Sequence, residues 1–254
     1  MEKLYLIIFF ILGSGIGTIS TILGLRLPKQ EKIFGNKLHC DNCSHELKKT
    51  DTIPIISYII QHGRCRYCNT KIDILYPYME FFSGLLFSVA YYSFGFRYEL
   101  LIALGIITML MIIVVSDLTY LIIPDEVLIF FSIYFIIIQL LNIGLKETLM
   151  HIGTGILLFA MMYLIMLIGN KALKKESLGG GDIKMMFLFG LVLDPLLGTI
   201  SIFLGSLFAL PMSLYLMNKN KEKAIPFGPF LLIAFTFIYF TKITSTTIMS
   251  WLGF

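Results

Sequence analysis

Runs of about 20 apolar residues recur along almost the whole chain, and a run of that length is what a helix needs to cross a membrane. The chain of 254 residues is 57% hydrophobic and only 14% charged. Apolar runs of this length predict an all-α polytopic membrane protein with about eight transmembrane helices. The predicted spans are residues 4–25, 76–95, 99–116, 127–143, 149–169, 183–193, 196–217 and 229–250.

The basic residues indicate how the chain is oriented. Most of its 20 Lys and Arg residues lie in residues 26–75, 170–184 and 218–228. Loops rich in Lys and Arg stay on the cytoplasmic side of a cell membrane. These three segments are therefore predicted to be cytoplasmic, with both termini outside. The net charge of +4 is concentrated in such loops and indicates no nucleic-acid partner.

The longest polar interruption predicts a small cytoplasmic domain at residues 26–75, between a first helix (1–25) and a membrane domain (76–254). All four cysteines lie in it, as two C-x-x-C pairs in "HCDNC" and "GRCRYC". Pairs separated by about 20 residues are typical of a zinc ribbon. The predicted zinc ligands are Cys40, Cys43, Cys65 and Cys68. Four thiolates leave no open coordination position, so the zinc is expected to be structural. Disulfides are the alternative, which a reducing cytoplasm disfavours.

Two aspartates lie at predicted cytoplasmic ends of apolar runs. Asp117 ends the third run, and Asp182 follows Gly179, Gly180 and Gly181 at the start of the sixth. Two carboxylates in a partly dry site share one proton, so one acts as base and the other as acid, as in aspartic proteases. The glycines would let an extended substrate backbone approach closely. The alternative is that the aspartates cap helices and the glycines form a plain loop.

With these residues in place, the chain resembles the bacterial type IV prepilin peptidases (leader peptidase/N-methyltransferases), the GxGD aspartic proteases of membranes. The resemblance extends almost from end to end and includes the paired C-x-x-C motifs. Its other motifs are "RLP" at 26–28, "DTIPIISYI" at 51–59, "YPYMEFFSG" at 76–84, "SDLTYLIIPD" at 116–125, "GGGDIK" at 179–184 and "IPFGPFL" at 225–231.

The resemblance implies roles for individual residues. Asp117 and Asp182 take the catalytic positions, and Asp125 matches an aspartate of secondary importance. Lys184 matches the lysine of the GxGDxK pattern, and Glu80 matches an acidic residue associated with methylation. The implied reaction is cleavage of type IV prepilins or pseudopilins after a glycine on the cytoplasmic side. Methylation of the new N-terminus with S-adenosylmethionine is implied to follow, and that cofactor rests on the resemblance alone.

Other functions fit parts of the same pattern. One alternative is a peptidase without methyl transfer, and another is a non-enzymatic assembly protein for pili, secretion or competence. The intact aspartate pair argues against the second of these. A proton-coupled transporter would carry carboxylates near the middle of the membrane, whereas these lie at the edges of the apolar runs.

Overall fold

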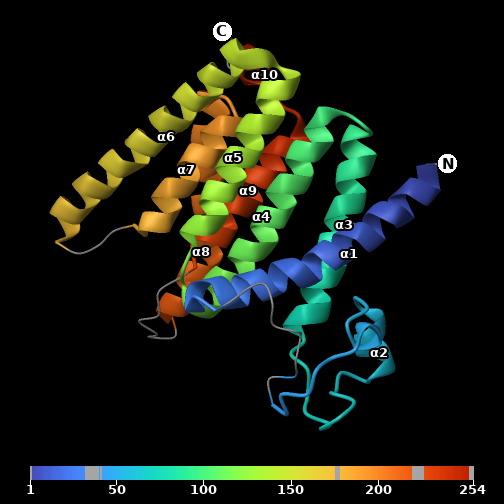
Figure 1. Cartoon of the computed structure of the whole chain (residues 1–254). Helices are drawn as coiled ribbons and strands as arrows, with labels where there is room; N and C mark the ends of the chain where they lie inside the picture. The colour runs from blue at the N-terminus through green and yellow to red at the C-terminus, as the bar shows by residue number, and fades with distance from the viewer. Residues whose placement is uncertain (1, 32–39, 41, 175–177, 219–225, 252–254) are drawn as a thin grey trace. The chain divides into compact units, whose positions relative to one another are not determined.

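The computed structural model describes residues 2–31, 40, 42–174, 178–218 and 226–251, and their regular structure is helical (Figure 1). Parts of the predicted cytoplasmic segments, residues 32–39, 175–177 and 219–225, lie outside the described residues. The α-helices are α1 (Glu2–Arg26), α2 (Ile56–Ile60), α3 (Leu75–Phe94), α4 (Tyr98–Tyr120), α5 (Asp125–Asn142), α6 (Gly144–Leu173), α7 (Gly180–Val192), α8 (Pro195–Asn218), α9 (Gly228–Thr241) and α10 (Ser245–Trp251). Short 3₁₀ turns span Leu27–Lys29 and Lys49–Asp51.

The prediction of an all-helical membrane protein is confirmed at this coarse level. Each of the first seven predicted spans overlaps one helix, and within the described ranges five helices are long and apolar enough to cross a membrane. These are α1, α4, α5, α6 and α8. The other three predicted spans are α3, which carries Glu80 and several tyrosines, and the shorter helices α7 and α9. A crossing by these three helices remains a prediction.

The last predicted span was wrong in its extent. Residues 229–250 form two helices, because α9 ends at Thr241 and α10 begins at Ser245. Lys242 follows α9 with φ 54° and ψ 21°, a left-handed conformation that terminates a helix. Hydropathy alone cannot detect this break, because a single backbone rotation does not change the average of a window.

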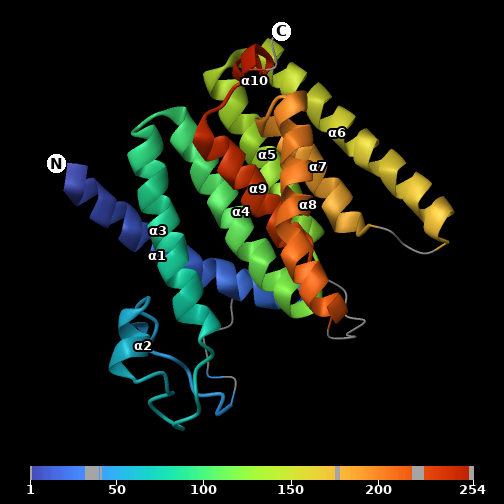
Figure 2. The ribbon, with the colours of Figure 1, turned by 180° about the vertical axis from the view of Figure 1, so that it is seen from behind.

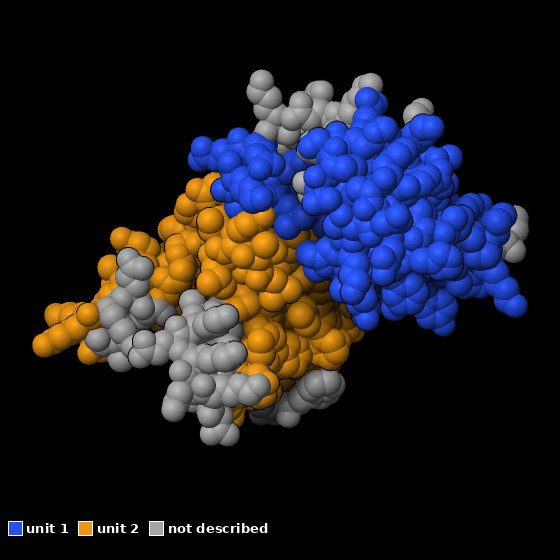
Figure 3. Space-filling model, turned by 90° about the horizontal axis from the view of Figure 1, so that it is seen from below, with its two compact units in different colours: residues 1–96 blue, residues 97–254 orange. Residues whose placement is uncertain are grey.

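The chain folds as two compact units, residues 1–96 and 97–254 (Figure 3). By packing, α3 therefore groups with α1 and the cysteine-containing segment. The functional division predicted from the sequence, into residues 1–25, 26–75 and 76–254, remains a prediction. Within the second unit, α4 contacts α5 and α9, and α7 contacts α5. Helix α6 packs along α7, and α8 packs along α9 (Figures 1 and 2).

In the first unit, α1 and α3 approach each other unusually closely at a glycine. A Cβ on Gly17 would lie 2.7 Å from the Met79 carbonyl oxygen and 2.8 Å from the Glu80 Cα. Small residues allow membrane helices to pack backbone against backbone in this way. Gly15 lies on the same helix, but a Cβ there would meet no atom within 4 Å.

We expect Gly17→Ala to loosen this helix pair while Gly15→Ala leaves it intact. Overpacking a tight contact costs about 1–3 kcal/mol, whereas replacing an uncrowded helical glycine by alanine is neutral or favourable by up to about 1 kcal/mol. Thermal unfolding in detergent, monitored by the protease resistance of residues 2–96, should give a lower unfolding temperature for Gly17→Ala than for Gly15→Ala. Equal unfolding temperatures would show that the α1–α3 contact is not as close as described.

Candidate active site

Asp117 lies in the last turn of α4 because that helix continues beyond the predicted apolar run. The helix ends where Leu121 adopts a left-handed conformation, and its backbone N–H donates to the Asp117 carbonyl at 3.0 Å. The Ser116 hydroxyl donates to the Ile122 carbonyl and so fixes the connection to α5. The Asp117 side chain is only 5% exposed, and it points into the bundle rather than capping the helix in water.

Asp182 lies in the first turn of α7, close after the N-cap residue Gly179. Its side chain is 8% exposed. A helix N-terminus favours negative charge, because the free backbone N–H groups there carry partial positive charge. The sequence predicted a glycine turn before Asp182, and the structure instead includes Gly180 and Gly181 in the helix.

The three glycines before Asp182 have different surroundings. A Cβ on Gly179 would lie 3.0 Å from Asp182 Oδ2, and one on Gly181 would lie 2.7 Å from the Cβ of Ile123. A Cβ on Gly180 would meet nothing within 4 Å. Gly181 therefore permits α7 to pack against the α4–α5 connection, while Gly180 faces open space at the surface.

The two aspartates converge on Gly228, the first residue of α9. A Cβ placed on Gly228 would lie 3.2 Å from Asp117 Oδ2, 3.5 Å from Asp182 Oδ1 and 3.0 Å from Ile123 Cδ1. Both of these carboxylate oxygens are buried and have no hydrogen-bond partner among the described residues. Unpaired buried oxygens that approach the same point cannot both carry full charge without a large penalty, so the pair is suited to share one proton.

Gly228 was not recognised as a site residue from the sequence. It belongs to the "IPFGPFL" motif, which supported the resemblance without a stated role. The available signal was a glycine at the start of an apolar run, followed by Pro229 as in a helix first turn. That signal predicts a helix start, but it does not predict what the glycine faces.

We expect Gly228→Ala to lower the catalytic rate about 10- to 100-fold. The added methyl group would occupy the space between the two carboxylates, and overpacking of this kind costs about 1–3 kcal/mol. Gly153→Ala is the matched control, since a Cβ at Gly153 would meet nothing within 4 Å. Turnover should be measured on both variants at equal folded concentration. Full activity of Gly228→Ala would mean that the space between Gly228 and the two carboxylates is not needed for the reaction.

Asp125 and Lys184 lie apart from this convergence and pair with each other. Lys184 Nζ lies 2.8 Å from Asp125 Oδ1 and 2.7 Å from Asp125 Oδ2. Both side chains are about half exposed. The pair joins the first turn of α5 to the start of α7, and an exposed ion pair of this kind contributes about 0–1 kcal/mol. Asp125 is therefore engaged by a cation, whereas Asp117 Oδ2 and Asp182 Oδ1 have no hydrogen-bond partner among the described residues.

The four cysteines form a cluster in the first unit. Their sulfur atoms all lie within 4.8 Å of one another, and no two of them are joined in a disulfide. The Cys40 and Cys68 sulfurs are 3.8 Å apart. Two sulfurs bound to a tetrahedral zinc at ~2.3 Å would be about 3.8 Å apart, so the cluster fits four-thiolate zinc. Hydrogen bonding to Thr70 lowers the pKa of the Cys68 thiol to about 6. At Cys43, a backbone hydrogen bond at His45 is outweighed by desolvation and by the neighbouring Cys68 and Cys40 sulfurs, which raise the pKa of the Cys43 thiol to about 11.

The two C-x-x-C turns share one hydrogen-bond pattern. The Cys40 N–H donates to the His45 carbonyl at 3.0 Å, and the Cys65 N–H donates to the Thr70 carbonyl at 2.8 Å. In each turn the residue after the second cysteine, Ser44 or Asn69, is left-handed and donates its N–H to the carbonyl of the first cysteine. Both turns therefore present their two sulfurs in the same way.

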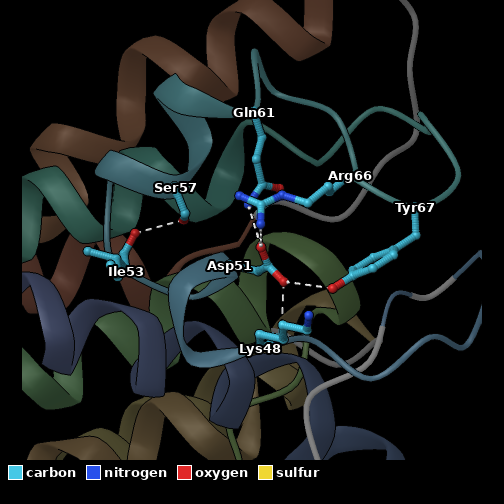
Figure 4. A network of polar contacts seen from close by, with 7 residues as sticks. All are labelled: Lys48, Asp51, Ile53, Ser57, Gln61, Arg66 and Tyr67. Carbon is cyan, nitrogen blue, oxygen red and sulfur yellow. Dashed lines mark hydrogen bonds and ion pairs between the residues drawn. The ribbon is translucent and has the colours of Figure 1, made fainter.

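Asp51 holds the second turn against the rest of the cysteine-containing segment (Figure 4). Its carboxylate accepts hydrogen bonds from the Lys48 N–H at 3.1 Å and from the Gln61 amide and the Tyr67 hydroxyl, each at 3.3 Å. Arg66 lies 3.4 Å away and compensates the charge. Sequence reasoning did not single out Asp51, because no local pattern shows that the chain folds back on it from Gln61, Arg66 and Tyr67.

Glu80 belongs to the first unit, and each of its carboxylate oxygens accepts a hydrogen bond from the protein. Thr18 donates its hydroxyl to Oε1 at 2.8 Å, and the Ile55 N–H donates to Oε2 at 2.7 Å. Glu80 is 7% exposed. Its hydrogen bonds connect α3 to α1 and to the start of α2, so Glu80 holds these three segments together.

The second unit thus combines apolar helices with two buried carboxylates that approach one point. Comparison with known families identifies two matches. Residues 11–94 match the bacterial peptidase A24 N-terminal domain, and residues 104–214 match the type IV leader peptidase family. The two matches fall on either side of the boundary between the compact units.

Individual relatives agree with this assignment. A protein from Bacillus subtilis (strain 168), named prepilin leader peptidase/N-methyltransferase, is 30% identical over 87% of this chain and 88% of its own length. One of the same name from Vibrio cholerae is 27% identical over 95% of this chain and 98% of its own length. No solved structure matches the chain. The chain belongs to the type IV leader peptidase family, which confirms the resemblance found in the sequence.

Proposed function

We propose that the protein is a membrane aspartic endopeptidase that removes the leader of type IV prepilins or pseudopilins after a glycine, on the cytoplasmic side. Family membership supports the enzyme class, and relatives of similar length are named prepilin leader peptidase/N-methyltransferase. The single observation that carries the chemistry is the convergence of Asp117 and Asp182 on Gly228.

The proposed mechanism uses the aspartate pair as one unit. The ionised carboxylate takes a proton from a water molecule, whose oxygen attacks the carbonyl carbon of the scissile peptide bond. The protonated carboxyl group donates its proton to the carbonyl oxygen. When the resulting tetrahedral intermediate collapses, the C–N bond breaks and the leaving nitrogen receives a proton from the pair. The open space at Gly180 would admit the extended substrate backbone.

We further propose that the same protein methylates the new N-terminus, as the names of its relatives state. S-adenosylmethionine would supply the methyl group. Each Glu80 oxygen accepts one hydrogen bond, from Thr18 or from the Ile55 backbone, so the carboxylate is held in place beside α1 and α2.

Zinc is proposed as a structural metal held by the four clustered cysteines.

A peptidase without methyl transfer is the second candidate function, and a non-enzymatic assembly protein is disfavoured by the buried aspartate pair. Co-expression with a candidate prepilin, followed by mass spectrometry of the product N-terminus, distinguishes these functions. We expect loss of the leader together with gain of one methyl group. Loss of the leader alone indicates the peptidase-only enzyme, and an unprocessed prepilin contradicts the proposal.

The proposed topology places residues 26–75, 170–184 and 218–228 in the cytoplasm and both termini outside. Reporter fusions after Lys48 and after position 220 are therefore expected to report the same side of the membrane. The reason is that both positions lie in segments rich in Lys and Arg, which are retained in the cytoplasm. Reports from opposite sides would rule out an eight-span arrangement.

A further inference from the structure

The cysteine-containing segment carries an exposed apolar face on α2. Four isoleucines are strongly exposed, and we call them the isoleucine face: Ile53 (41%), Ile56 (54%), Ile59 (64%) and Ile60 (65%). Ile56, Ile59 and Ile60 lie on one side of α2 by their spacing, and Ile53 precedes the helix. A cluster of large apolar side chains open to solvent on a small polar domain indicates an interaction surface.

The depth of α2 follows from the hydrogen bonds of Glu80. Ile55 immediately precedes α2, and its N–H is 2.7 Å from Glu80 Oε2. The other Glu80 oxygen is 2.8 Å from the Thr18 hydroxyl in α1. Along α1, Thr18 lies about 12 Å before Arg26 at a rise of about 1.5 Å per residue, in a helix that is apolar enough to cross a membrane. The start of α2 is therefore held against Glu80 in the second turn of α3, and Figure 1 shows α2 beside the lower end of that helix.

The side chains around this level match a membrane–water boundary. Tyr78, Phe81 and Phe82 of α3 are 53%, 46% and 48% exposed, and they extend the apolar surface beside Glu80. Aromatic residues are enriched at this boundary. Arg64 and Lys71 are exposed near α2 in the chain and suit the anionic surface of the cytoplasmic leaflet.

We propose that the isoleucine face inserts into the cytoplasmic leaflet and anchors the cysteine-containing domain at the membrane surface. Short amphipathic segments bind membranes in this way, with their apolar side chains among the upper parts of the lipid chains. The proposal rests on the cytoplasmic location of residues 26–75 proposed above. Its consequence is that the domain is held at a fixed depth, beside the helices that Glu80 joins, instead of being suspended in the cytoplasm.

Fluorescence quenching by brominated lipids tests this directly in the full-length, zinc-loaded protein. The chain has one tryptophan, so Trp251→Phe provides a background without tryptophan. Ile59→Trp then reports from the isoleucine face, and Asn69→Trp reports from an exposed position in the second C-x-x-C turn. Both variants are reconstituted into vesicles of phosphatidylcholine and phosphatidylglycerol with bromines on the lipid chains.

We expect the lipid bromines to reduce the emission of Ile59→Trp roughly twofold or more, as for a side chain at the headgroup–acyl boundary, and to leave Asn69→Trp nearly unchanged. Zinc content of about one per chain, as for a four-thiolate site, confirms that each variant is folded, and Ile60→Trp serves as a second reporter.

Equal, weak quenching of the Ile59→Trp and Asn69→Trp variants would overturn the proposal. Protection of the Ile59→Trp reporter from aqueous iodide only after prepilin is added would also overturn it, since the face would then belong to the substrate. A separate cleavage assay shows whether the peptidase function itself holds.

Discussion

Replacing either Asp117 or Asp182 by Asn should abolish cleavage of a prepilin, with a loss of about four orders of magnitude or more, as for members of one catalytic unit. The reason is that the neutral amide can neither take a proton from water nor share one with its partner. The double variant should be little worse than either single variant, because the pair acts together. Mass spectrometry of the prepilin after incubation in detergent measures the remaining leader.

Asp125→Asn is the matched control for the catalytic pair. Its carboxylate is exposed and bound by Lys184, and loss of an exposed ion pair costs at most about 1 kcal/mol. We therefore expect it to retain most of its activity. If Asp125→Asn removed cleavage while Asp117→Asn did not, the catalytic partner would be the wrong aspartate. If both Asp117 and Asp182 were dispensable, the protein would not be an aspartic protease.

Replacing Cys65 by Ser should remove zinc from the protein and unfold the cysteine-containing domain. Zinc binding supplies about 10–16 kcal/mol in small zinc-binding peptides, which is more than a domain of this size gains from its core. The wild-type protein is expected to hold about one zinc per chain, and the variant close to none. Metal analysis and limited proteolysis of residues 40–74 check both effects. Cleavage should survive, because the aspartate pair lies in the other compact unit.

Asn69→Gly is the control for the zinc prediction. Asn69 has a φ of 57°, a conformation that glycine adopts without strain, so this variant should keep its zinc. Purified wild-type protein without zinc would contradict the prediction, as would Cys40–Cys43 and Cys65–Cys68 disulfides in the native cell.

The positions of the long helices were predictable because each is encoded locally. An apolar run of sufficient length has to become a helix in a membrane, where every backbone group must be bonded internally. The cysteine cluster was predictable for a similar reason, since the spacing of its two pairs is a property of the sequence. The break between α9 and α10 was not, because it depends on the backbone conformation of Lys242.

The aspartate pair was predicted to lie at one end of the bundle, but its geometry was not. Asp117, Asp182 and Gly228 come from three helices that are far apart in the chain. Their convergence depends on how those helices pack, which no local pattern records. Asp51 was missed because its partners, the Lys48 backbone, Gln61, Arg66 and Tyr67, are brought together by the fold of one small segment. Helix packing also explains why Gly180 and Gly181, which are alike in the sequence, have different surroundings.

The shared hydrogen-bond pattern of the two C-x-x-C turns bears on how the metal is acquired. Each turn closes through contacts between its own backbone groups, from Cys40 to His45 and from Cys65 to Thr70. Either turn can therefore form before the other is in place and offer a two-sulfur site to an arriving ion. Zinc would then bind first to the two sulfurs of one turn, and the second turn would add its two sulfurs afterwards. The rate of zinc loading should therefore depend more on the chain between the two turns than on either turn.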